Sequence, residues 1–184
     1  MPEVIISMEQ QIHFARMDSP IGPLLLADAG SGLCSVLFAS KDGSPDRSAL
    51  LARLDRRYGS FTLVESLDRL AQAVSYLEDY FIAPAASGPY QGKLAPGGTE
   101  FQRRVWNWLI RIPAGEAASY SEVANRVGRP QASRAVGSAC RANPLPIFIP
   151  CHRVIGKTGL LTGFGGGLEL KARLLKEESW AGPG

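Results

Sequence analysis

The chain has 184 residues, 45% apolar and 20% charged, so it can bury a core and its composition excludes wholesale disorder. The formal net charge is +3, with 8 basic and 11 acidic side chains in residues 1–98 against 12 and 6 in residues 99–184. The excess positive charge of the second half favours a polyanionic partner, although a solvated basic face would give the same pattern.

Membrane, metal and cofactor sites are not expected. The longest apolar runs fall far short of the about 20 residues that a spanning helix needs, and residues 1–11 lack the features of a signal peptide. Three cysteines cannot all pair internally, so we expect a cytoplasmic, reducing location and at least one free thiol. There are two histidines and no Cys-x-x-Cys motif, and the glycines of 156–167 fit neither phosphate-binding pattern.

The first half reads as a small α/β module. Short apolar runs bounded by Gly and Pro predict strands over 11–17, 22–27 and 33–39. Helical spacing of apolar residues then predicts helices over 46–58 and 67–81. Nothing in this half indicates chemistry, and Cys34 is expected in its core.

A stretch rich in Pro, Gly, Ala and Ser separates the two halves. It predicts a linker over 84–98 between an N-terminal α/β domain with a structural role, 1–83, and a mainly helical domain, 99–184. The predicted fold class is therefore α+β.

The second half opens with three predicted helices. Thr99 can cap the first, in which Phe101, Val105, Trp108 and Ile112 share one face. Ser119 and Glu122 form a capping box that opens a second helix through Val127. Gly128 ends that helix, and Pro130 is expected to start a third that runs to about 142. The last two helices form a helix-turn-helix candidate, although most helical hairpins bind nothing.

A proline-rich segment, 143–154, follows the third helix. Its three prolines predict an extended, rigid path that cannot be helical and that delivers Cys151 and His152 to a defined place. A Gly-rich loop, 156–167, and a final helix, 168–178, complete the chain.

Cys151 and His152 are the candidate chemical groups. A thiol reacts as thiolate, and His152, Arg153 and a carboxylate such as Glu177 or Glu178 could activate it. A buried structural cysteine beside a surface histidine is the plainer alternative, and a cysteine hydrolase or redox enzyme is a further one.

The residues around Cys151 resemble the O6-alkylguanine-DNA alkyltransferases, also called methylated-DNA–protein-cysteine methyltransferases. The resemblance covers about 98–178 strongly and residues 19–24 and 32–33 weakly. It rests on these motifs, in family order: Gly98-Thr99-x-Phe101-Gln102-x-x-Val105-Trp106, Ile112-Pro113-x-Gly115, Ser119-Tyr120, Arg134-Ala135-Val136-Gly137, Asn143-Pro144, Ile149-Pro150-Cys151-His152-Arg153-Val154, Gly166-Gly167-Leu168, Lys171, Leu174-Leu175 and Glu178.

The resemblance implies repair of DNA by a single-turnover, suicidal transferase. Cys151 would take the alkyl group from guanine O6, and His152, oriented by Glu178, would remove the thiol proton through a water. Tyr120 would protonate the leaving guanine, and Asn143 would tie the turn after the recognition helix to the active site. A thioether has no carbonyl for water to attack, so each molecule would react once.

The resemblance also implies a DNA-binding surface and a substrate pocket. A winged-helix-like helix-turn-helix would bind duplex DNA in the minor groove, and the damaged base would be flipped out. Arg134 would fill the vacated space in the stack. The other expected DNA contacts are Ser119, Tyr120, Ala135 and Gly137, and the expected pocket residues are Cys140, Val154, Phe164 and Gly165. We expect a monomer that needs no protein partner and can cluster along DNA.

Two positions depart from the family pattern. Phe164 and Gly165 stand where the family often has Tyr and Ser, so one hydroxyl contact to O6 is absent while the backbone donor of Gly165 remains. The alternative function is a non-catalytic sensor of alkylated DNA. Relatives of that kind carry Trp at the acceptor position, and Cys151 argues against it.

Overall fold

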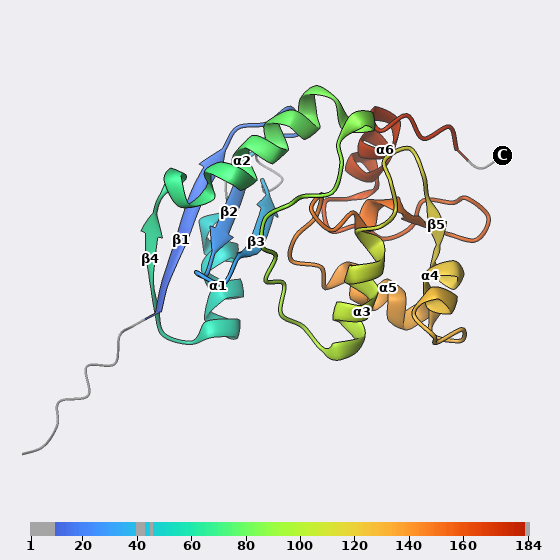
Figure 1. Ribbon diagram of the computed structural model, residues 1–184, viewed down its shortest axis with the longest axis horizontal. Coiled ribbons are helices and arrows are strands. Elements are labelled where there is room, and N and C mark those ends of the chain that lie inside the picture. The colour runs from blue at the N-terminus through green and yellow to red at the C-terminus, as the bar shows by residue number, and fades with distance from the viewer. Residues whose placement is uncertain (1–9, 40–42, 45, 183–184) are drawn as a thin grey trace, which may run out of the picture.

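The computed structural model describes residues 10–39, 43–44 and 46–182 (Figure 1). Residues 1–9, where no signal peptide is expected, lie outside the described residues. A four-stranded sheet with two helices forms the first half, and four helices with a short two-stranded sheet form the second. The predicted α+β class is confirmed. Within the described part of the chain, no helix is long and apolar enough to cross a membrane.

The four-stranded sheet has the order β3-β2-β1-β4, with β4 parallel to β1 and the other pairs antiparallel. Three strands match the predicted ones closely, but β4 was not predicted. It is only five residues long and lies between two helices. Its short alternating pattern is a weaker signal than the helical periodicity on both sides, so it was not recognised as a strand. The strands are β1 (Gln10–Met17), β2 (Leu24–Asp28), β3 (Leu33–Phe38) and β4 (Phe61–Glu65).

The sheet is covered on both faces. The helix α1 (Arg47–Tyr58) packs Leu50 and Leu54 against one face. The helix α2 (Leu67–Ile82) packs Leu77 and Tyr80 into the core on the other face. The first four residues of β2 are buried, so they form a continuous apolar run, LLLA, instead of an alternating one.

The core on the α2 side continues into the second half of the molecule. Phe148 packs against both Tyr76 and Tyr90, with ring centroids 5.0 and 4.9 Å away, and the two tyrosine rings are themselves 5.2 Å apart. The segment that crosses between the halves contains η1 (Pro84–Ala86) and then pairs with β3, where Leu33 N donates to the Lys93 carbonyl. The expected division into 1–83, 84–98 and 99–184 stays a prediction.

Four helices build the second half, and two of them begin with the capping boxes that their sequences indicate. Thr99 and Gln102 cap α3 (Glu100–Leu109), and Ser119 and Glu122 cap α4 (Tyr120–Arg126). Trp106 of α3 is buried and donates its indole N–H to the Ala139 carbonyl, which fixes α3 against α5 (Ser133–Arg141). The fourth is α6 (Leu168–Glu177).

The third predicted helix begins later than expected. α5 starts at Ser133, and Pro130 lies in the turn before it. Gly128 ends α4 with a φ of 71°, a conformation that glycine adopts without strain. The turn from 127 to 132 is therefore longer than predicted, but α4 and α5 pack on each other as a helical pair (Figure 1).

The proline-rich segment is not extended as predicted. It folds into compact turns in which Ile149 N donates to the Leu145 carbonyl and Ile147 has a φ of 73°. Cys151–Arg153 then form a 3-10 turn, η2, followed by β6 (Val154–Ile155), which pairs with β5 (Ala118–Ser119). The prediction was wrong because a proline φ near −65° fits turns as well as extended chain.

Candidate active site

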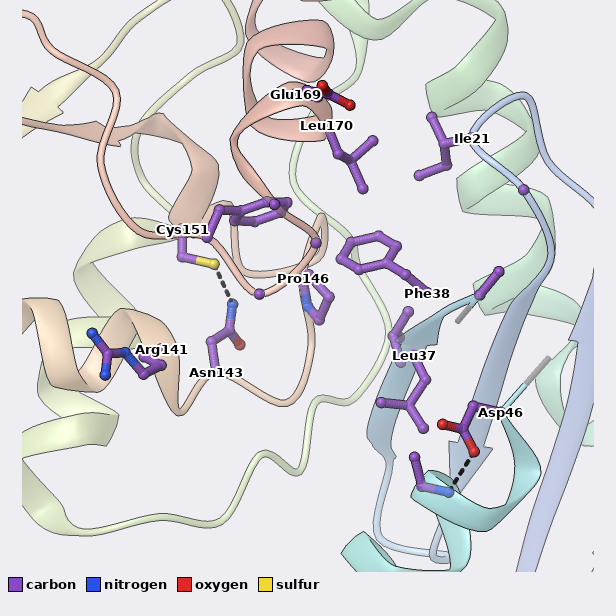
Figure 2. Close-up of a pocket in the computed structure, with 18 of the residues that line it drawn as sticks. Ile21, Leu37, Phe38, Asp46, Arg141, Asn143, Pro146, Cys151, Glu169 and Leu170 are labelled. Carbon is purple, nitrogen blue, oxygen red and sulfur yellow. Dashed lines mark hydrogen bonds between the residues drawn. The ribbon is translucent and has the colours of Figure 1, made fainter. Parts of the chain in front are cut away.

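Cys151 lies at the start of η2 with its thiol hydrogen-bonded by an amide. Asn143 Nδ2 donates to Cys151 Sγ at 3.1 Å and to the Ile149 carbonyl at 2.8 Å (Figure 2). Asn143 Oδ1 in turn accepts from Leu145 N at 3.0 Å. Both ends of the Asn143 amide are thus held by the turn that follows α5, and one donor is aimed at the sulfur.

The thiol opens onto a cleft of about 940 Å³ between the two halves of the chain. Figure 2 shows Cys151 and Asn143 on one side of this cleft, and Phe38 and Leu37 of β3 on the other. Cys151 itself is 5% exposed and is one of the residues that line this cleft.

Glu178, directly after α6, is the acceptor of several buried hydrogen bonds near Cys151. Its carboxylate accepts from His152 Nε2 at 2.9 Å, from Tyr80 Oη at 2.8 Å, and from Arg153 Nε and Nη2 at 2.8 and 2.7 Å. Burial alone would raise the pKa of Glu178, but the hydrogen bonds and charges of His152 and Arg153 outweigh it and hold the pKa at about 2. Glu178 is therefore an anion at neutral pH.

His152 is fully buried and neutral. Burial lowers its pKa, and the Glu178 anion only partly offsets this. Because the anion accepts at Nε2, the neutral ring carries its proton there and leaves Nδ1 as a hydrogen-bond acceptor. Nδ1 has no protein partner among the described residues. The ring therefore has a free basic nitrogen, on the residue that directly follows Cys151 in the chain.

The thiol of Cys151 holds its proton at rest. Burial raises its pKa, while the Asn143 amide and the nearby Lys171 ammonium act in the opposite direction. Lys171 is buried on α6 and donates to the carbonyls of Val154 and Thr162. A proton acceptor is thus needed before the sulfur can attack, and His152 can fill that role.

Tyr120 opens α4 beside this site. The β5–β6 pairing places Ser119 opposite Ile155, and Tyr120 Oη donates to the Thr162 carbonyl at 3.2 Å. Burial raises the pKa of Tyr120, so the phenol keeps its proton at neutral pH. Tyr120 can therefore act as a proton donor.

The expected DNA contacts lie on α4 and α5, away from the Glu178 network. Arg134 and Ala135 are exposed on α5, Ser119 caps α4, and Gly137 faces the Tyr120 ring. An added Cβ on Gly137 would stand 3.7 Å from that ring, which is an ordinary van der Waals contact.

The expected pocket residues divide into two groups. Cys140, Phe164 and Gly165 line the cleft, whereas Val154 is buried in β6 and its carbonyl accepts from Lys171. Burial raises the pKa of Cys140, so it forms a wall of the cleft and not an activated thiol. The ring of Phe164 lies between His152 and Phe38, with centroid distances of 6.2 and 5.8 Å.

Three residues of the network were not assigned these roles from the sequence. Tyr80 comes from the first half, so no local pattern links it to Glu178. Lys171 could have been noticed, because it shares the inward face of α6 with Leu174, Leu175 and Glu178 at helical spacing. Arg153 was considered only as a neighbouring charge, but it also binds the Ile112 carbonyl. No group of three or more His, Cys, Asp or Glu among the described residues could hold a metal ion.

Comparisons with known proteins identify the family. Residues 100–180 match the family described as "6-O-methylguanine DNA methyltransferase, DNA binding domain". The methylated-DNA–protein-cysteine methyltransferase of Mycobacterium leprae is 45% identical over 167 residues, which are 91% of this chain and 92% of that protein. The one from Methanosarcina acetivorans is 44% identical over 170 residues, 91% and 98% of the two chains.

Solved structures extend the similarity to the whole fold. The crystal structure of the Mycobacterium tuberculosis O6-methylguanine methyltransferase has a TM-score of 0.75 and 39% identity, covering 91% of this chain and 93% of that one. The M. tuberculosis OGT in complex with DNA has a TM-score of 0.69 and 40% identity, covering 91% and 92%. With near-complete coverage at this identity, the chain belongs to the methylated-DNA–protein-cysteine methyltransferase family.

Proposed function

We propose that the protein reverses DNA alkylation directly, by moving the alkyl group of O6-alkylguanine onto Cys151. The observation that carries this assignment is the Cys151 sulfur, which faces the cleft under the Asn143 amide while His152 beside it is held by the Glu178 anion. We infer the reaction from the family to which the chain belongs, and the roles of the residues from this arrangement.

In the proposed reaction the sulfur displaces guanine from the alkyl carbon. The S–C bond forms as the C–O6 bond breaks. The thiol proton passes to His152 Nδ1 through a bridging water, and Glu178 stabilises the imidazolium that results. Tyr120 gives its proton to the departing guanine, so neutral guanine is released. The thioether cannot be hydrolysed, and one chain therefore repairs one lesion.

The partner is DNA. In the proposal, α4 and α5 bind duplex DNA in the minor groove, and the lesion is rotated into the cleft because its alkyl carbon cannot be attacked in line within the stack. Arg134, exposed on α5, takes the space that the base leaves. One chain carries every proposed group, so we propose a monomer that acts on chromosomal DNA in the cytoplasm and can cluster along it.

Intact mass before and after incubation with duplex DNA carrying O6-methylguanine tests this function, followed by peptide mapping. We expect one added methyl group on Cys151 and none on Cys140. Cys151→Ser should abolish transfer while binding to the damaged duplex persists, and Cys140→Ser should still accept the group. Tight binding by the wild type without any mass change would replace this proposal with the sensor.

A further inference from the structure

Arg53 connects the first half of the molecule to the turn that carries Asn143. It lies on α1, and its Nη1 donates to Ser35 Oγ at 3.3 Å, to the Val36 carbonyl at 3.3 Å and to the Pro144 carbonyl at 3.4 Å. The sequence separation between Arg53 and Pro144 is 91 residues, and Pro144 directly follows Asn143. One guanidinium thus spans β3 and the active-site turn.

The Pro144 carbonyl has a second donor from the same side. Val36 N of β3 donates to it at 2.8 Å. The Pro144–Leu145 peptide is therefore fixed through its carbonyl by two groups from the first half, and its N–H donates to Asn143 Oδ1. The other end of the Asn143 side chain is held by the Ile149 carbonyl and Cys151 Sγ. A shift of this peptide moves the Leu145 N–H that holds Asn143 Oδ1 and so changes the aim of the Asn143 amide.

The charge of Arg53 has no local partner that would explain its position. It is half-buried, and within the described part of the chain it makes no salt bridge. Burial and the neighbouring Arg56 cation lower its pKa. A half-buried cation whose partners are neutral oxygens is costly to hold, which argues that the link to Pro144 has a use.

We propose that Arg53 is a positioning residue for the acceptor cysteine: by holding the Pro144 carbonyl it keeps the Asn143 amide on the Cys151 sulfur and so promotes formation of the thiolate. This inference rests on the proposed role of Cys151 as acceptor. It gives the first half a part in the chemistry through α1 and β3, although neither element places a side chain on the sulfur.

Arg53→Met tests the link, because it keeps the apolar stem and removes the donors. We expect the apparent pKa of Cys151 to rise by about half a unit to one unit, since a weakened amide contact stabilises the thiolate less. At neutral pH the reaction of Cys151 should slow by about three- to tenfold. Arg53→Lys restores a donor, so its apparent Cys151 pKa should lie between those of wild type and Arg53→Met.

The readout is the pH dependence of Cys151 alkylation by iodoacetamide, quantified by peptide mass so that Cys34 and Cys140 are counted separately. Methyl transfer from damaged duplex is measured alongside. The control is Arg56→Met on the same helix. Arg56 is exposed, and within the described part of the chain its Nε donates to the Ala52 carbonyl of its own helix, so this variant removes a charge without touching Pro144.

The Asn143→Ser background tests whether Arg53 acts on Cys151 through Asn143. There Arg53→Met should leave the apparent pKa of Cys151 unchanged, because the amide that it positions is gone. Equal pH profiles for Arg53→Met and Arg56→Met would overturn the inference, as would the same pKa rise with and without Asn143. If wild-type protein transfers no methyl group while the iodoacetamide profile still depends on Arg53, the proposed function fails and the positioning role stands.

Discussion

At the scale of single residues, Glu178 determines the charge state of the site. Its pKa is about 2 in the folded protein against an ordinary 4.5, so its ionised form stabilises the fold above about pH 4.5, and this stability is lost as the pH falls toward 2. Glu178→Gln should therefore be much less stable than wild type at pH 7. The difference in the free energy of unfolding between wild type and variant, measured by urea denaturation, should narrow steadily between pH 5 and pH 2.

The same variant should react slowly. Without the anion, His152 loses the group that stabilises its protonated form, so we expect methyl transfer at neutral pH to fall by about a hundredfold. Glu177→Gln is the matched control, because the salt bridge of Glu177 among the described residues is a surface pair with Arg173. A gap in stability that stays constant down to pH 2 would show that the Glu178 carboxylate titrates normally.

Gly165 is a second residue whose effect can be isolated. No atom lies within 4 Å of where its Cβ would stand, so Gly165→Ser should fold normally and place a hydroxyl at the rim of the cleft. We expect the ratio of methyl to benzyl transfer rates to change, measured with the two adducts in the same duplex. Identical ratios for the variant and wild type would exclude Gly165 as a determinant of substrate range.

Part of this site could be predicted from the sequence, and part could not. Cys151, His152 and Glu178 were expected together, and the structure places His152 on Glu178 directly. Tyr80 could not be foreseen, because it reaches Glu178 across 98 residues and its only local signal is a place on the apolar face of α2. Long-range contacts of this kind depend on how the halves pack, which periodicity does not encode.

At the scale of elements, α5 is the helix on which DNA contact is expected to depend. Arg134→Ala removes one exposed cation from it, which should cost little of an affinity that many phosphate contacts share. We expect undamaged duplex binding to weaken by less than about threefold, while extrusion of a 2-aminopurine probe base falls further. A variant that binds much more weakly yet extrudes the base normally would contradict this role.

Element boundaries follow the strength of the local signal. α3 and α4 begin at the predicted residues because Thr99 and Ser119 each complete a capping box. α5 has no side-chain cap, and Pro130 suggested a start three residues too early. The compact turns of 143–150 were not predicted because the prolines also fit an extended path, whereas the Asn143 side chain closes local turns through Leu145 N and the Ile149 carbonyl.

At the scale of the whole molecule, the two halves should unfold together. One apolar core runs from the sheet through Phe148 into the helices. Phe148→Ala should cost about 3–5 kcal/mol, because it removes a buried ring packed against two tyrosines. We expect a single calorimetric transition at a lower temperature. Reaction of Cys34, buried in β3, with a thiol reagent should follow the same transition; earlier reaction of Cys34 would show that the sheet melts alone.

Trp106 provides an intrinsic optical probe of these events. It is 2% exposed and its indole N–H is bonded to the backbone of α5 at Ala139, whereas Trp108 and Trp180 are partly exposed. Indole emission depends on the polarity and hydrogen bonding around the ring. A movement of α5 on DNA would therefore change the fluorescence of Trp106, and rapid-mixing experiments could time it without a label.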